Sequence, residues 1–144
     1  MIDVETDKLI YQIVNAVNAI GAKRVVFDSI SSLESSTMNK NQVRELLITL
    51  SGFFKTVGVT CIMTYLTPIA FGATKDQLLS SLETSEMKLS SVMDGIIILR
   101  FIERGQNVKK LLNIIKVRGS EHNKAIFQYE IDKEGFKFGD KFEI

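Results

Sequence analysis

The first half of the chain alternates helical and strand-like segments, and this order constrains the fold more than any other feature. Apolar residues recur at helical spacing over 7–20 and 43–57, and a glycine follows each stripe. Thr6 is placed to cap the first helix. A short β-branched run follows each helix, at 22–28 and at 59–66. Helix–strand–helix–strand order predicts βα crossovers and a parallel sheet with helices on its faces.

The second half consists of strand-like runs joined by short turns. Consecutive strands with tight turns predict antiparallel hairpins. We therefore expect an α/β fold in which parallel strands with flanking helices carry a C-terminal antiparallel hairpin extension. The expected strands are 95–102, 108–117, 124–131 and a short last one at 136–138.

Composition narrows the class of protein. The chain has 144 residues, 45% of them hydrophobic and 24% charged, which predicts one domain over residues 1–144 and excludes a disordered or fibrous chain. No apolar run is long enough for a membrane helix, and the N-terminus does not resemble a signal peptide. The single cysteine, Cys61, fits a reducing cytoplasm. A net charge of +1 argues against a nucleic-acid binder that relies on bulk charge.

One acidic residue ends the first predicted strand. Residues 25–28 read Val-Val-Phe-Asp, and an acid at the carboxyl end of a parallel strand lies where open α/β sheets bind ligands. In nucleotide hydrolases such an Asp holds Mg²⁺, usually through water, so Asp28 is a candidate metal-binding residue. A structural interpretation, in which Asp28 caps the following turn, accounts for the pattern equally well.

Basic residues gather at the end of a later strand. Lys116 and Arg118 alternate, so both point to one side of the strand, and Gly119, His122 and Lys124 follow. Cations beside a glycine turn can form an anion site. Lysine and arginine are also common in solvated hairpin turns at exposed sheet edges, and the spacing does not separate the two interpretations.

Three stretches in this order resemble a KaiC-like domain of the RecA/RadA superfamily of P-loop ATPases. They are AKRVVFDSISSLE, DGIIILRFIERG and KVRGSEHNKAIFQYEIDKEGF, of which the Lys-x-Arg-Gly-Ser-x-His segment is the most specific. The resemblance covers residues 3–139 and implies a RecA-like fold.

The resemblance also implies roles for particular residues. Asp28 matches the Walker B acid, which holds Mg²⁺ beside ATP. Lys116 and Arg118 match a pair that reaches across a subunit interface to the neighbour's ATP, and His122 and Lys124 match further contacts to that nucleotide. These roles imply a homo-oligomer, a dimer or a ring, with ATP at its interfaces.

The serine pair Ser90-Ser91 stands just before a strand, where clock members of the family carry a phosphorylation pair. No Gly-x-x-x-x-Gly-Lys-Ser/Thr motif occurs in the 144 residues. The family's catalytic glutamate pair would also lie upstream of Met1. We therefore expect the C-terminal two-thirds of such a domain, with no catalytic residue in this chain alone.

The P-loop strand of the family lies between the strands at 59–66 and 95–102. Without it, either these two strands meet directly or another chain fills the gap. Apolar surface at Ile62, Ile96 and Ile98 would then be poorly covered and favour association. Two functions remain: part of an ATPase site, or a non-catalytic assembly or regulatory module derived from a KaiC-like ATPase that lost its P-loop.

Overall fold

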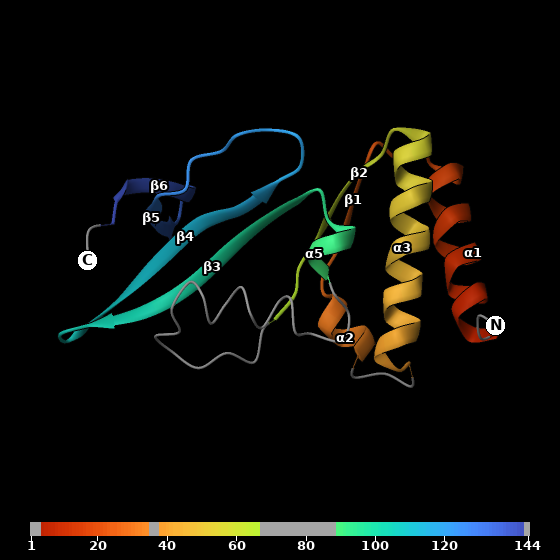
Figure 1. The fold of residues 1–144 in the computed structure, drawn as a ribbon, viewed down its shortest axis with the longest axis horizontal. Helices are drawn as coiled ribbons and strands as arrows, with labels where there is room; N and C mark the ends of the chain where they lie inside the picture. Colours follow the sequence, from red (N-terminus) through yellow and green to blue (C-terminus); the bar gives the residue numbers. More distant parts are fainter. Residues whose placement is uncertain (1–3, 35–37, 67–88, 143–144) are drawn as a thin grey trace. The chain divides into compact units, whose positions relative to one another are not determined.

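The computed structural model describes residues 4–34, 38–66 and 89–142, and these residues fall into two compact units (Figure 1). The expectation of a single domain over 1–144 stays a prediction. The first unit contains α1 (Val4–Ala19), β1 (Arg24–Phe27), α2 (Ile30–Glu34), α3 (Lys40–Val57), β2 (Thr60–Met63) and α5 (Leu89–Val92). The second contains β3 (Gly95–Arg104), β4 (Asn107–Val117), β5 (Ile126–Asp132) and β6 (Gly135–Lys141).

The first unit is built on the parallel pair of β1 and β2, as the helix–strand order predicts. The register runs from Arg24 opposite Thr60 to Phe27 opposite Met63. Helices α1 and α3 lie side by side in Figure 1 and pack their apolar stripes against one face of the strand pair. The buried centre of this core is formed by Val17, Leu46, Leu50 and Phe54.

The ends of the two long helices show which helix boundaries can be predicted from neighbouring residues in the sequence. Helix α3 starts with a capping box, in which Asn39 and Gln42 exchange hydrogen bonds of 2.7 and 3.0 Å between side chain and backbone. It ends at Gly58, whose φ of 68° is the left-handed conformation that glycine adopts most readily. The expectation that Thr6 caps α1 is wrong: the helix already begins at Val4, and Thr6 is buried within it.

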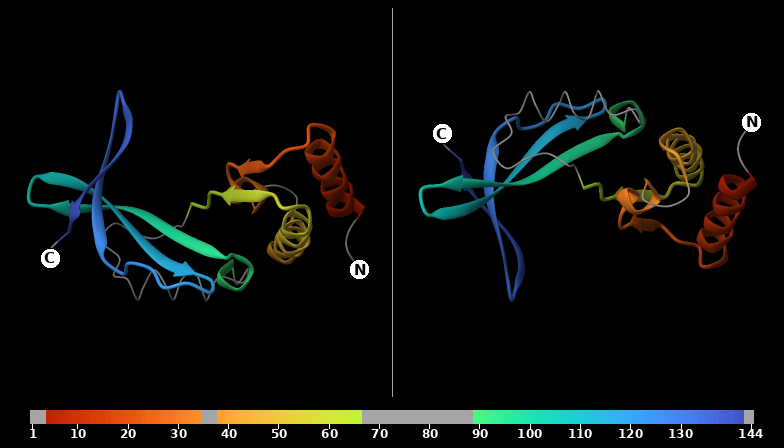
Figure 2. Two further views of the ribbon diagram at one scale, coloured as in Figure 1. Left: turned by 90° about the horizontal axis from the view of Figure 1, so that it is seen from above. Right: turned by 90° about the horizontal axis from the view of Figure 1, so that it is seen from below.

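The second unit is an antiparallel sheet in the order β3-β4-β5-β6. Strands β3 and β4 pair along their whole length, whereas β4 meets β5 only through Leu111–Asn113. Figure 2 shows β5 and β6 running across the long β3–β4 hairpin. The predicted antiparallel extension is confirmed. Both hairpin strands extend further toward their turn than the apolar pattern indicates, because polar residues can also form the hydrogen bonds of the ladder.

The strands at 59–66 and 95–102, between which the family's P-loop strand was expected, belong to different sheets. Among the described strands, β2 is hydrogen-bonded only to β1, and β3 only to β4. The two arrangements considered for these strands stay predictions.

The exposed apolar residues differ in part from those expected. Ile62 is 60% exposed, which confirms its prediction. On β3, however, the exposed residues are Ile97 and Leu99, while Ile96 and Ile98 are half-buried. Because side chains alternate along a strand, one of these two pairs faces solvent when the other faces inward. The register places Ile98 opposite the fully buried Asn113, on the inward face. The expectation for Ile96 and Ile98 is therefore wrong.

Two polar stretches contain short helices. Helix α2 lies in the stretch 29–41, and α5 contains Ser90 and Ser91 at the end of the hydroxyl-rich stretch 80–91. The remainder of that second stretch lies outside the described residues. Within the described ranges, no helix has the length and apolar character needed to cross a bilayer.

Candidate functional site

Asp28 is the first residue after β1, at the carboxyl edge of the parallel pair. Its Oδ1 accepts a 2.6 Å hydrogen bond from the hydroxyl of Thr64, which is the first residue after β2. Backbone bonds join the same two strand ends, because the Thr64 N–H donates to Phe27 O at 3.0 Å and the Ile30 N–H donates to Thr64 O at 2.9 Å. The carboxylate is therefore held on a hydrogen-bonded edge while the residue itself stays exposed.

The chain that follows Asp28 is also fastened to the end of β2. The Ser31 hydroxyl accepts the Leu66 N–H at 2.8 Å, and the hydroxyls of Ser29 and Ser32 lie 3.3 Å apart. The peptide bond between Asp28 and Ser29 is cis. These contacts form a small polar surface at the edge where α/β sheets bind ligands.

The Thr64 hydroxyl is a functional group that the sequence analysis missed. The signal was present, because Thr64 is the first polar residue after the apolar core of its strand, just as Asp28 is in its own. Phe27 pairs with Met63, so the next step in the register brings Asp28 opposite Thr64. That register was the missing information.

The residues around Asp28 are suited to Mg²⁺ more than to a metal held entirely by protein. Among the residues that the structure describes, no three His, Cys, Asp or Glu side chains gather to bind a metal ion. Mg²⁺ usually keeps several waters and is bound by one or two carboxylates together with substrate phosphates. A single exposed carboxylate with a second oxygen beside the one bonded to Thr64 fits that mode.

Lys116 and Arg118 lie at the end of β4, in the second unit. The ladder pairs Lys116 with Ile96, and one step past its last pair the Arg118 N–H donates to Asp94 O at 2.7 Å. Because side chains alternate along a strand, Lys116 and Arg118 lie on one face of the hairpin. On that face, Arg118 Nε is 3.2 Å from Asp94 Oδ1.

The loop after Arg118 carries the other two candidate residues. Gly119 has a φ of 71°, so the backbone turns there in a conformation that residues with a Cβ adopt at a cost. His122 is half-buried and Lys124 is exposed, and Asn123 Oδ1 accepts the Ala125 N–H at 2.9 Å just before β5. The structure thus places both residues on the irregular segment that joins β4 to β5.

The candidate residues are divided between the two units. Asp28 and Thr64 belong to the first, and the basic residues belong to the second. Each group is therefore a separate local arrangement, and the roles suggested for their members stay predictions. The basic group is Lys116, Arg118, His122 and Lys124.

Three further residues singled out in the sequence, Cys61, Ser90 and Ser91, also lie in the described part of the chain. Cys61 packs against the core of the first unit, and burial raises the pKa of its thiol to about 11. A raised thiol pKa disfavours the thiolate, the form in which cysteine acts as a nucleophile. Ser90 is half-buried and Ser91 is exposed on α5.

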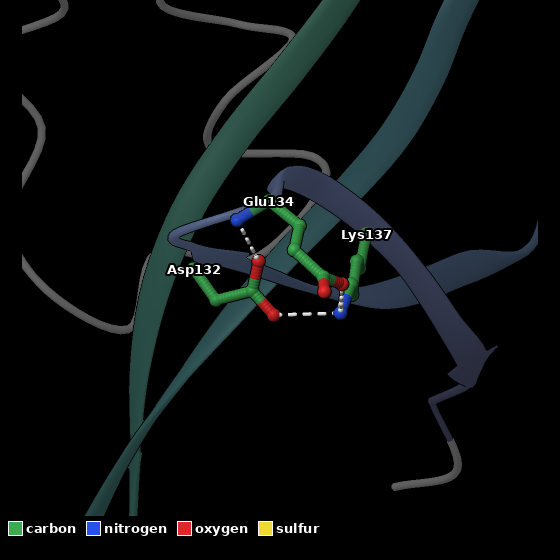
Figure 3. A network of polar contacts seen from close by, with 3 residues as sticks. All are labelled: Asp132, Glu134 and Lys137. Carbon is green, nitrogen blue, oxygen red and sulfur yellow. Dashed lines mark hydrogen bonds and ion pairs between the residues drawn. The ribbon is translucent and has the colours of Figure 1, made fainter.

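A second charged cluster closes the β5–β6 hairpin (Figure 3). Lys137 Nζ lies 2.7 Å from both Asp132 Oδ2 and Glu134 Oε2, and the Glu134 N–H donates to Asp132 Oδ1 at 2.8 Å. Lys137 and then the Glu134 N–H lower the pKa of Asp132, while Asp132 and then Glu134 raise the pKa of Lys137. One ammonium thus faces two carboxylates in this exposed cluster, all within the β5–β6 hairpin.

A parallel pair under helices, an acid at its carboxyl edge and an antiparallel extension define an α/β fold of the RecA-like class. A family model described as the KaiC ATPase matches residues 2–143. The chain belongs to that family, and its fold is that of a KaiC-like, RecA-superfamily ATPase domain.

Curated and solved relatives agree with this assignment. The circadian clock oscillator protein KaiC of Thermostichus vulcanus and the circadian clock protein KaiC3 of Synechocystis sp. are each 32% identical over 119 residues, or 83% of this chain. The crystal structure of a KaiC-like protein from Pyrococcus horikoshii OT3 matches 96% of this chain with a TM-score of 0.72 and 25% identity. The chain spans about a fifth of the length of those two curated relatives and 56% of the archaeal structure.

Proposed function

We propose that this chain contributes two parts of an ATP-hydrolysing site, one from each unit. Asp28 acts as the Walker B acid for the nucleotide of its own subunit. Lys116 and Arg118, with His122 and Lys124, contact the nucleotide of a neighbouring subunit. The observation that carries the proposal is the position of Asp28 at the carboxyl edge of β1, hydrogen-bonded to Thr64, in a chain of the KaiC family.

In the first part of the site, Asp28 would hold Mg²⁺ through water. When bound, Mg²⁺ neutralises charge on the nucleotide phosphates. The Thr64 hydroxyl fixes the carboxylate of Asp28 through Oδ1, and Oδ2 can then accept a hydrogen bond from a water of the metal. A fixed acceptor needs little reorganisation when the nucleotide binds.

The second part supplies positive charge. Arg118 offers a planar fork that matches two phosphate oxygens, whereas Lys116 offers a compact charge, so the two cations complement each other. Both lie on one face of the hairpin end, which favours a common target. In this proposal the assembly is a homo-oligomer with ATP between subunits.

A mixing experiment tests whether the two parts belong to different subunits. Subunits with Asp28→Asn and subunits with Arg118→Ala are each expected to be inactive in the ATPase assembly that contains these residues. Mixed interfaces that join an intact Asp28 to an intact neighbouring Arg118 should restore phosphate release. A mixture of Arg118→Ala subunits with subunits that carry both substitutions offers no intact interface and controls for the effect of mixing itself.

The outcomes separate the possible functions. Recovery supports action between subunits. Absence of recovery despite demonstrated subunit exchange would show that the basic residues act within their own chain or perform no chemistry. Full activity of both single variants would favour the non-catalytic assembly or regulatory module.

A further inference from the structure

Asp94 and Arg118 form a cross-strand pair at the open end of the β3–β4 hairpin. The Arg118 N–H donates to Asp94 O at 2.7 Å, one step beyond the last ladder pair, so the two residues lie directly opposite each other. Their side chains meet on the same face, with 3.2 Å between Arg118 Nε and Asp94 Oδ1. The backbone thus sets the position of the carboxylate relative to the guanidinium.

The contact engages the stem side of the guanidinium. A guanidinium has five N–H donors, and a single carboxylate accepts at most two of them in a fork geometry. The printed contact between Arg118 and Asp94 therefore leaves the guanidinium with more N–H donors than one carboxylate can accept. An arginine held in this way can still present donors to a phosphate group.

Lys116 and Arg118, the basic pair, differ in the residue that lies opposite each of them on β3 or just before it. The residue opposite Arg118 is an aspartate, whereas the residue opposite Lys116 is the aliphatic Ile96. The side chains of Arg118 and Asp94 are 50% and 53% exposed. Because exposed ion pairs contribute little to stability, the pair is not needed to hold the fold.

We propose that Asp94 is the positioning residue for Arg118: the Oδ1–Nε contact keeps the guanidinium oriented toward the phosphate group of a neighbouring subunit's nucleotide. The destination of the guanidinium rests on the proposed function above, whereas its orientation by Asp94 does not. A flexible arginine loses rotamer freedom when it binds, and pre-ordering by Asp94 removes part of that cost.

The first experiment measures the order of Arg118 without nucleotide. In the purified chain, the Arg118 Nε–Hε group should show a resolved resonance and a heteronuclear NOE typical of an ordered side chain. Asp94→Asn keeps an acceptor oxygen and should preserve both features, whereas Asp94→Ala should remove both. Asp132→Ala, which breaks a different exposed ion pair of the same unit, should leave them unchanged. An Arg118 side chain that is equally mobile with and without Asp94 would overturn the inference.

The second experiment titrates the same variants, in the ATPase assembly that contains these residues, with MgATP and follows the shifts of Arg118 and its neighbours. Asp94→Ala should weaken the response about 3- to 10-fold, and Asp94→Asn should change it less than about 2-fold. If both variants strengthened the response, the carboxylate would be competing with phosphate, and positioning would be wrong. A response that falls in Arg118→Ala but not in Asp94→Ala would also overturn it.

Failure of the proposed function has a different signature. A response that is absent, or that is the same with and without Arg118, contradicts phosphate binding by this residue. The order of the Arg118 side chain then decides the role of Asp94 by itself.

Discussion

The two compact units bury their apolar residues in different ways. In the first, α1 and α3 enclose a core whose central residues are almost fully buried, and one face of the strand pair closes it. In the second, β3 pairs along its whole length with β4 yet leaves Ile97, Leu99 and Phe101 largely exposed. The first unit therefore buries its apolar stripes between helices and strands, whereas the second buries Leu111, Leu112 and Tyr129 but leaves one apolar face of β3 exposed.

The contrast matters for function because each candidate group is held in place by the contacts of its own unit. Asp28 lies at the edge of a packed layer, where helices hold the strands beneath it. Arg118 lies at the end of a ladder, where one more cross-strand pair orients it. The following predictions test this difference, beginning with the largest expected effect.

Arg118→Ala should lower ATP turnover in the assembly by a factor on the order of 10³, as expected for loss of an arginine that stabilises transition-state charge. The unfolding midpoint should hardly change, because the side chain is half-exposed. Phosphate release and urea unfolding check the two statements. Arg104→Ala, another arginine of the same hairpin, is the control. A fall in turnover that merely follows a fall in stability would contradict the assigned role.

Leu50→Ala should destabilise the chain by about 2–5 kcal/mol, because it leaves a cavity in the packed core of the first unit. Leu99→Ala, the same substitution at a half-exposed position of β3, should cost about 1 kcal/mol or less. Urea unfolding of the purified chain measures both. Equal costs would show that the two units do not differ in how they bury apolar residues.

Asn39→Ala should cost about 1 kcal/mol, because it removes the side-chain acceptor of the α3 capping box. The matched control is Asn41→Ala, the same substitution on an exposed face inside the first turn, where alanine's helix propensity makes the change neutral or slightly stabilising. Thermal unfolding compares the two. A loss that is the same in both variants would mean that helix propensity, and not the cap, is being measured.

The smallest expected effect is a pH dependence of the β5–β6 hairpin. The pKa of Asp132 is lowered in the folded chain, so its contribution is present above the ordinary aspartate pKa and is lost as the pH falls through the lowered value. The pKa of Lys137 is raised, so its contribution is present below the ordinary lysine pKa and is lost as the pH rises through the raised value.

Carboxyl resonances of Asp132, followed by NMR during an acid titration, measure the first of these shifts. Lys137→Ala should move the pKa of Asp132 back toward its ordinary range, because the Lys137 ammonium is the largest cause of the shift. Lys133→Ala removes a neighbouring charge that does not take part in the cluster and should leave the pKa low. If the pKa of Asp132 did not change in Lys137→Ala, the cluster of Figure 3 would not persist in solution.

The sequence by itself determined the features that depend on near neighbours. The apolar stripes of both long helices, the stop at Gly58 and the tight hairpin turns are local, and each was predictable from spacing and residue type. The candidates Asp28 and Arg118 were also recognisable, because an acid after a strand and a Lys-x-Arg pair are local patterns. Their roles remain predictions.

Only the tertiary structure decided which partner each of these side chains has. Thr64 is 36 residues from Asp28, and the contact follows from the parallel register of β1 and β2. Asp94 contacts Arg118 because the antiparallel register of β3 and β4 places the two residues opposite each other. The exposed face of β3 was predicted wrongly because both faces of that strand are apolar, so composition does not distinguish them. A shift of one residue in register exchanges the two faces, and only long-range strand pairing determines that register.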